Sequence, residues 1–136
     1  MPELETIPDQ ECVRLLQSHR LGRIALAGRD GRPLIFPVNY FFDEGVLVFR
    51  TDPGTKLDLA PGAHVAFEID GWDPDRGAGW SVVVKGISHD ITDPGDARAQ
   101  RMRYWPVKPV APGEKEHWIG VWANEITGRR FGPPAS

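Results

Sequence analysis

Residues 33–51, PLIFPVNYFFDEGVLVFRT, contain two apolar segments separated by the turn sequence Asp43-Glu44-Gly45. The segments Pro33 to Phe42 and Val46 to Thr51 are rich in the aromatic and β-branched residues that favour strands. The short turn between them predicts an antiparallel pair. Because Pro37 cannot donate a ladder hydrogen bond, it predicts an edge or a bulge in the first strand.

Further strands are expected on both sides of this pair, at Gly22 to Ala27, His64 to Asp70, Trp80 to Ile91 and His117 to Phe131. Short helices are expected at Pro8 to Ser18 and Asp93 to Tyr104, one or two helical turns within residues 52–62, and a loop at Gly71 to Gly79. About six strands joined mainly by hairpins predict a mainly β protein with an antiparallel sheet. The sheet should close into a small barrel, because closure removes exposed edges.

Length and composition narrow the class of protein. The 136 residues correspond to one domain, residues 1–136, and the net charge of −3 argues against a nucleic-acid partner. The single cysteine, Cys12, excludes an internal disulfide and a cysteine-rich zinc site. No apolar run approaches the ~20 residues that span a bilayer, and the acidic N-terminus lacks the apolar core of a secretory signal. We therefore expect a cytoplasmic protein with no membrane partner.

The stretch Phe49 to Leu59, FRTDPGTKLDL, concentrates groups that suit a phosphate. Arg50 offers a planar fork of donors, Thr51 and Thr55 offer hydroxyls, and Lys56 adds a compact charge. The first turn of a following helix would add the positive end of its dipole. The simpler explanation is a strand-to-helix turn with solvated cations, and the pattern alone leaves both open.

Two other stretches could contact a flat ligand. In Phe36 to Tyr40, FPVNY, a strand disrupted by proline would expose main-chain groups that can read a heterocycle, although Pro37 could simply bend the strand. In Gly79 to Gly86, GWSVVVKG, Trp80 could stack on a ring and Ser81 could donate to it. The alternative for Trp80 is that it closes the mouth of the barrel.

In this order and spacing, the stretches resemble the pyridoxamine 5′-phosphate oxidase-like flavin-binding split barrels, most closely the small bacterial branch that includes the nitroimidazole-resistance-type proteins. The resemblance covers roughly residues 8–92 and returns at Ile126 to Phe131. It implies a six-stranded split barrel that forms a homodimer, with a flavin, usually FMN, in a cleft between the subunits. Some relatives use the deazaflavin F420 instead, and others bind haem.

The resemblance implies roles for residues at matching positions. The phosphate would be held by Arg50, Thr51, Thr55 and Lys56, and main-chain contacts with the flavin ring would come from Pro37, Val38, Asn39 and Tyr40. Contacts in the cleft would come from Trp80 and Ser81, and the partner subunit would contribute Trp122 and Arg129. The chain departs from the family in two places. Gly54-Thr55-Lys56 replaces a Gly-His-Lys-like pattern of the nitroimidazole-resistance type, and the C-terminal Trp and Arg pattern that grips pyridoxal phosphate is not clearly present. Neither special chemistry is therefore predicted.

The function expected from this resemblance is a flavin- or F420-dependent oxidoreductase that transfers hydride or electrons to a small organic substrate. The alternatives are a non-catalytic flavin carrier, store or sensor, and a small β-barrel module for single-stranded nucleic acid or protein. No catalytic acid or base is assigned, and the scattered histidines predict no metal site. Glu68 and Asp70, two apart on one strand face, could be an acid/base pair or a solvated strand end.

Overall fold

The computed structural model describes residues 3–28, 30–51, 62–92, 97–107 and 117–133. Within these ranges the strands are β1 (Glu3–Thr6), β2 (Leu21–Ala27), β3 (Pro33–Asp43), β4 (Val46–Thr51), β5 (His64–Asp73), β6 (Ala78–Asp90) and β7 (His117–Gly132), and the helices are α1 (Asp9–Ser18) and α2 (Ala97–Met102). The mainly β prediction is confirmed. Neither of these helices has the length and apolar character needed to cross a membrane.

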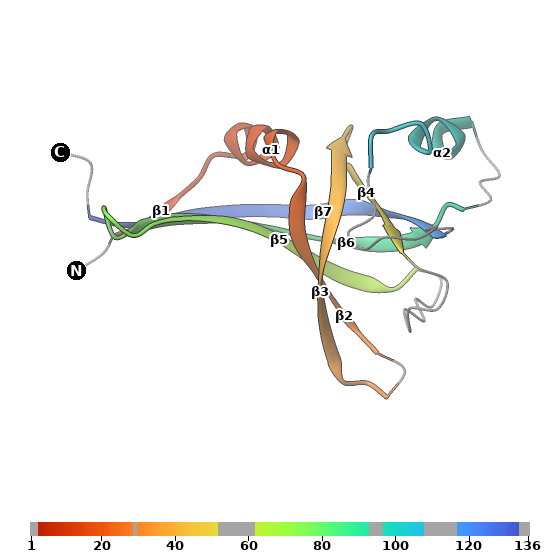
Figure 1. Cartoon of the computed structure of the whole chain (residues 1–136), viewed down its shortest axis with the longest axis horizontal. Coiled ribbons are helices and arrows are strands. Elements are labelled where there is room, and N and C mark those ends of the chain that lie inside the picture. Colours follow the sequence, from red (N-terminus) through yellow and green to blue (C-terminus); the bar gives the residue numbers. More distant parts are fainter. Residues whose placement is uncertain (1–2, 29, 52–61, 93–96, 108–116, 134–136) are drawn as a thin grey trace.

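The strands form one antiparallel sheet in the order β1-β7-β4-β3-β2-β5-β6, and β6 pairs again with β7. The strands from β7 round to β6 thereby close into the expected barrel. The described sheet has seven strands rather than the six expected, because β1 pairs with the part of β7 that extends beyond β4, from Thr6↔Arg129 to Glu3↔Gly132. The polar sequence of β1 gave little strand signal, and its pairing is supplied by the long neighbouring strand (Figure 1).

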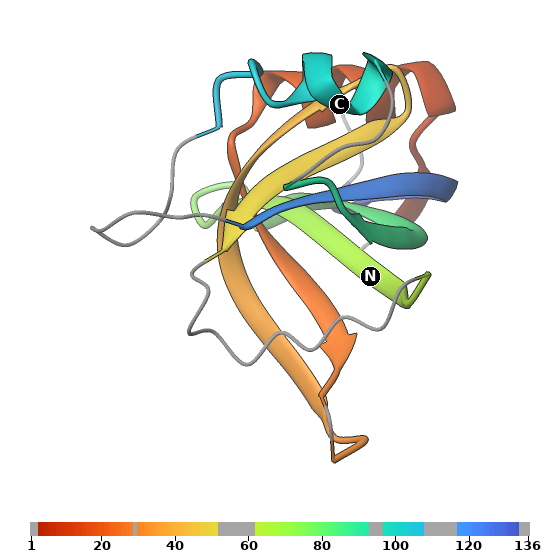
Figure 2. The same ribbon diagram turned by 90° about the vertical axis from the view of Figure 1, so that its right-hand side faces the viewer.

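The barrel interior is filled by alternate residues of the ring strands, including Ile24, Tyr40, Phe49, Phe67 and Val84. Helix α1 adds Cys12 and Leu16, both fully buried, to this core. Cys12 is therefore the small buried hydrophobe that the apolar stripe of its helix predicts. Figure 2 shows both helices at one end of the barrel and the tip of the β2–β3 hairpin at the other.

A second apolar cluster lies on the outer face of β4 and β7. It comprises Val46, Val48, Ile91, Met102, Val107 and Trp118, with Phe41, Trp105 and Trp122 packed against it. Helix α2 and the turn that follows it cover this face, since Met102 and Val107 are buried there. This cover brings the end of α2 close to the end of β4.

The barrel is split where the β2–β3 hairpin leaves the body of the molecule. Strand β2 pairs with β5 only over Arg23–Ala25, although its pairing with β3 runs from Leu21 to Ala27. Strand β3 pairs with β4 only from Tyr40 onward. Pro37 lies before that point, in the part of β3 that pairs with β2 alone, so the prediction of an edge position is confirmed.

The predicted loop Gly71 to Gly79 is wrong for most of its length. Strand β5 continues to Asp73 and β6 begins at Ala78, so the two strands form a long hairpin. The Asp73 side chain accepts from the amide of Asp75 at 3.1 Å and caps the tight turn, and Gly77 takes a positive φ of 61°. Because Gly and Asp are abundant there, the sequence resembled a loop, but the pairing of β5 with β6 and of β6 with β7 extends the strands.

The other departures are at the helices. Within the predicted helix Asp93 to Tyr104, α2 covers Ala97–Met102, residues 93–96 lie outside the described residues, and Arg103 and Tyr104 belong to a turn. The predicted helical turns in residues 52–62 fall almost wholly outside the described residues.

Candidate functional site

Arg50 lies near the end of β4 on the outer, α2-covered face of the barrel. Its guanidinium carbon is 5.0 Å from the centroid of the Trp118 ring, and Nη1 donates to the carbonyl oxygen of Val107 at 3.4 Å. Arg50 and Trp118 are ladder partners, so the stacking follows directly from the register. A half-buried guanidinium held in this way is pre-organised for an anion, because less side-chain freedom is lost on binding.

The open edge of β3 lies beside this arginine. The β3–β4 ladder ends at Tyr40↔Phe49, and Arg50 is the next residue of β4. The Tyr40 amide donates to the Arg20 carbonyl oxygen, which lies on the β2 side of β3. Because the main-chain polar groups of successive strand residues point to alternate sides, those of Asn39 and Pro37 point away from β2. Within the described residues no strand pairs with Pro37 on that side. The register thus brings a main-chain edge and a cation together.

The side chains of the predicted ring-binding stretch divide between the two faces of β3. Val38 and Tyr40 point into the core and are 6% and 1% exposed, so any contact they make with a ligand on the outer face is through the main chain. Burial raises the pKa of the Tyr40 phenol, and nearby Arg20 opposes this rise. Thr51 is also buried, and the alternation of β4 puts it on the opposite face from Arg50. Thr55 and Lys56 lie outside the described residues.

Trp80 and Ser81 leave β6 on opposite faces. Trp80 packs against the inner core and contacts the His19 ring edge-on, at 5.0 Å between centroids. Ser81 pairs with Asp70 of β5 and Arg129 of β7 on the outer face. A single flat ligand on one face of β6 would therefore contact only one of these two side chains.

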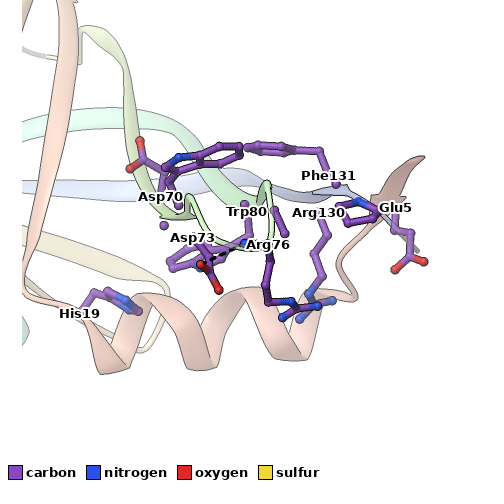
Figure 3. A pocket seen from close by; sticks show the side chains of 14 residues that line it. Glu5, His19, Asp70, Asp73, Arg76, Trp80, Arg130 and Phe131 are labelled. Atoms are coloured by element: carbon purple, nitrogen blue, oxygen red, sulfur yellow. Dashed lines mark hydrogen bonds between the residues drawn. The ribbon is translucent and has the colours of Figure 1, made fainter. Parts of the chain in front are cut away.

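Trp80 lines a pocket of about 480 Å³ between the β5–β6 hairpin, the end of β7, and the residues Glu5 and His19. Figure 3 shows Arg76 and Arg130 reaching into the same space, with His19 at one end and Glu5 at the other. Arg130 is already ion-paired with Glu11 of α1. This pocket is separate from Arg50 and has acidic and basic side chains in its wall.

Trp122 and Arg129 lie at different levels of β7. Trp122 pairs with Val46 and Ile87, and its ring meets His89 edge-on at 5.1 Å between centroids. Arg129 is exposed and pairs with Thr6 and Ser81. Of the predicted partner residues, Arg129 shares the outer face with Ser81, and Trp122 belongs to the rim of the second apolar cluster.

The predicted residues therefore fall into two groups at opposite ends of β7. The first group adjoins Trp118, the ladder partner of Arg50, and the second adjoins Arg129, the ladder partner of Ser81. Eleven positions of extended chain separate them, up to roughly 36 Å at ~3.3 Å per residue. Figure 1 shows β7 as one long band across the molecule. One copy of the chain does not bring both groups to one ligand.

An ionic cluster lies on the outer face next to the open edge of β3. Arg23, the ladder partner of both Glu68 and Pro37, contacts the carboxylates of Glu68 at 3.1 Å and Asp70 at 2.7 Å. The pKa of Glu68 is raised, first by burial and second by its hydrogen bond with Asp70. The pKa of Asp70 is lowered, first by the same hydrogen bond and second by Arg23. The two carboxylates share Arg23, and neither lies in an enclosed site.

Sequence reasoning missed the residues that hold Arg50. The Arg50 guanidinium contacts the Trp118 ring and the Val107 carbonyl oxygen, and Arg103 contacts the same ring. Residues 105–116 are rich in proline, and their sequence predicts no regular element and no contact with β4. A cation beside aromatic residues in MRYW was the available signal, but cation–π contacts have no fixed spacing in sequence.

Comparisons with known proteins identify the family and the fold of the chain. The profile of the pyridoxamine 5′-phosphate oxidase family matches residues 8–130. The FAD binding protein from Mycobacterium smegmatis is 35% identical, with a TM-score of 0.76 over 94% of this chain and 98% of that chain. A Corynebacterium glutamicum structure, provisionally named a pyridoxamine 5′-phosphate oxidase, is 32% identical, with a TM-score of 0.78 over 96% of this chain and 100% of that chain.

A curated relative, the uncharacterized protein Rv0080 of Mycobacterium tuberculosis, is 37% identical over an alignment of 107 residues, and the match covers 74% of this chain and 70% of the relative. The chain belongs to the pyridoxamine 5′-phosphate oxidase family, and its fold is the split barrel expected from the resemblance.

Proposed function

We propose that this protein binds a flavin nucleotide between two copies of the chain and transfers hydride or electrons from it to a small organic substrate. The cofactor proposed first is FMN, with F420 as the alternative. The observation that carries the proposal is the juxtaposition of the Arg50 guanidinium with the open main-chain edge at Pro37 and Asn39.

The residues present fit the two chemically different ends of such a cofactor. A phosphate needs a fixed cation, and Arg50 supplies one that Trp118 and the Val107 carbonyl hold in place. The edge of a heterocyclic ring needs donors and acceptors with little bulk, and a strand edge interrupted by proline supplies them at Pro37 and Asn39. Thr55 and Lys56 are proposed as additional phosphate ligands from the stretch that follows β4.

A second copy completes the site in this proposal. Arg129 of β7 and its ladder partner Ser81 of β6 lie too far from Trp118 to reach the ligand that Arg50 of the same copy holds. Paired by a twofold axis, the Ser81 end of one copy can meet the Arg50 end of its partner, which gives two equal sites. The exposed Trp72, stacked on Phe131 at 6.0 Å between centroids, provides apolar surface near this end for such an interface.

A bound flavin supplies reversible one- and two-electron chemistry. The chain's own residues hold and orient the cofactor: Arg50 fixes the phosphate, and the main chain of Pro37 and Asn39 fixes the ring edge. The neighbouring ion pairs of Arg23 with Glu68 and Asp70 hold these charged groups at fixed positions on the same outer face. No described side chain beside this edge is assigned as a proton donor or acceptor, so the proposal is redox chemistry led by the cofactor.

A second candidate is a flavin-binding protein without turnover, which serves as a carrier, a store or a sensor. The name of the Mycobacterium smegmatis neighbour, FAD binding protein, states a bound cofactor and no reaction. This candidate uses the same residues, and only reduction of a substrate by the loaded protein separates it from the oxidoreductase.

The test is a titration of the apo-protein with FMN, FAD, F420 and riboflavin, followed by fluorescence or calorimetry. We expect binding of one flavin per chain, and Arg50→Ala should weaken FMN binding by roughly tenfold or more, the effect of one charge-assisted hydrogen bond. Arg32→Ala is the matched control and should leave the affinity unchanged, because Arg32 is exposed and its ion pair among the described residues is with Asp30. Equal FMN affinity in the Arg50→Ala and wild-type proteins would refute the assigned phosphate site.

A further inference from the structure

The Trp118 ring has a second cation beside it. The guanidinium carbon of Arg103 lies 5.9 Å from the ring centroid, compared with 5.0 Å for Arg50. These two arginines come from distant parts of the sequence, one from β4 and one from the turn after α2. Trp118 is 8% exposed and forms part of the second apolar cluster, so the ring that both cations contact is itself fixed.

The turn that carries Arg103 is anchored at several points. The Tyr104 amide donates to the Arg101 carbonyl oxygen at 3.1 Å, and the Trp105 amide donates to that of Met102 at 3.0 Å. Met102 is buried beneath the turn, and the Trp105 ring packs on Phe41 at 5.1 Å between centroids. Arg103 is therefore presented from a local structure that the core holds in place.

The same turn also orients Arg50. Its last described residue, Val107, is buried and accepts the hydrogen bond from Arg50 Nη1. The segment 103–107 thus contributes two groups: the Val107 carbonyl oxygen, which orients the Arg50 guanidinium, and the Arg103 guanidinium, which contacts the same Trp118 ring. Two guanidinium groups held at the same ring favour a nearby ligand that carries more than one negative charge.

Arg103 has the chemistry of a ligand rather than of a structural ion pair. Its side chain is exposed, and within the described ranges it forms no salt bridge with a carboxylate. Its described contact is the Trp118 ring, which leaves its N–H donors available to a bound anion.

We propose that Arg103 is a second ligand for the anionic end of the flavin nucleotide, and that Trp118 is the positioning residue that sets it beside Arg50. This inference rests on the flavin-binding function proposed above and adds a residue that the family resemblance did not assign. The ligand class is a phosphate ester that bears two negative charges, such as the terminal phosphate of FMN. The turn after α2 then belongs to the binding site.

The experiment compares FMN with riboflavin, which has the same ring and no phosphate. In Arg103→Gln we expect FMN affinity to fall about tenfold, riboflavin affinity to be unchanged, and the dependence of FMN affinity on salt concentration to be shallower. Arg103→Lys should recover only part of the affinity, because an ammonium lacks the planar fork. Trp118→Phe keeps an aromatic ring at this position and should retain most of the wild-type FMN affinity.

Arg101→Gln is the matched control, since Arg101 is an exposed arginine in the last turn of α2 with no ring contact described. It should leave both affinities at the wild-type values. If Arg103→Gln binds FMN as tightly as wild type, the inference is wrong and the proposed function stands. An equal loss for FMN and riboflavin would indicate a structural role and would also overturn it. If the wild-type protein binds neither flavin, the proposed function itself fails.

Discussion

The Tyr40 hydroxyl donates a 2.7 Å hydrogen bond to the main-chain carbonyl oxygen of Leu16, and thereby links β3 to the last turn of α1. Both residues are buried, and the Tyr40 ring meets Phe67 edge-on at 4.7 Å between centroids. The connection lies directly behind the strand edge proposed to bind the flavin ring. It fixes the inner face of β3 while the outer face remains available.

Tyr40→Phe should lower the free energy of unfolding by about 1–2 kcal/mol, because the buried Leu16 carbonyl loses its partner while the ring packing is kept. Since burial raises the folded-state pKa of Tyr40 above the ordinary value of about 10, the folded state holds this proton longer than the unfolded state. The contribution of Tyr40 to stability is therefore complete below about pH 10 and is lost as the pH rises further.

Urea unfolding of both proteins between pH 7 and pH 11 measures this effect. The difference between wild type and Tyr40→Phe should shrink above pH 10. A difference that stays constant to pH 11 would show that Tyr40 ionises normally in the folded protein.

Gly128→Ala should destabilise the protein through a clash with α1. A Cβ at this position would lie 2.5 Å from the Cys12 sulfur and 3.0 Å from Ile7 Cβ. Overpacking of this kind costs about 1–3 kcal/mol. In the double variant with Cys12→Ala, the sulfur is absent, so the two substitutions should cost less together than the sum of their separate costs.

Thermal or urea unfolding of the four proteins in this cycle gives the coupling energy, which we expect to be favourable and about 0.5–3 kcal/mol. Strict additivity would mean that the backbone of β7 moves to accommodate the methyl group.

Glu68 should give the folded protein a measurable pH dependence. Because its pKa is raised in the folded state, chiefly by burial, the folded chain holds this proton to higher pH than the unfolded chain. The contribution of Glu68, relative to Glu68→Gln, is therefore greatest below the unfolded carboxyl pKa of about 4.3 and is lost as the pH rises through the folded value.

Unfolding of wild type and Glu68→Gln from pH 3 to pH 8 tests the direction. Asp70→Asn is the control of opposite sign, since the pKa of Asp70 is lowered and its contribution is lost only as the pH falls. A wild-type advantage over Glu68→Gln that grows with rising pH would contradict this account of the cluster.

The proposed two-copy site makes a prediction about mixed dimers. Arg50→Ala should remove the cation that binds the FMN phosphate. Ser81→Trp should place a bulky side chain on the face that the partner contributes to the site. Each variant alone should therefore bind FMN poorly. After exchange of subunits, each mixed dimer has one site with both changes and one site with neither. The mixture should therefore recover binding, and calorimetry should count about one tight site per mixed dimer.

If the site lies within one chain, mixing will recover nothing. Sedimentation of each variant alone is the control that both still form dimers, and a monomeric wild-type protein of 15.1 kDa would end the two-copy proposal.

Much of the fold could be predicted from local pattern. The strand-favouring residues of Pro33–Asp43 and Val46–Thr51, with a short turn between them, form the hairpin where the sequence indicated it. The hairpin at Asp73 was missed because its strand character comes from cross-strand neighbours, including the stacking of Trp72 on Phe131, and not from residues adjacent in sequence.

The candidate site was predicted in part, and for a similar reason. Arg50 and the Pro37 edge carry recognisable residue types, but the support for Arg50 comes from Trp118 and Val107, which only the ladder and the cover of α2 bring near. The faces of β7 were also beyond simple alternation. Asn124 is an extra residue opposite the step from Lys85 to Gly86, so Val121 and Ile126, five apart, both face the core.

This irregularity decides which face each residue of β7 presents beyond it. If Asn124 were paired regularly instead of bulging, everything beyond it would rotate by half a turn. Arg129 would then point into the apolar interior, and Gly128 would no longer make room for Cys12. A lone unpaired amino acid thus decides which side of the distal strand a neighbouring molecule encounters, whereas its deletion would restore regular alternation and leave that side unchanged.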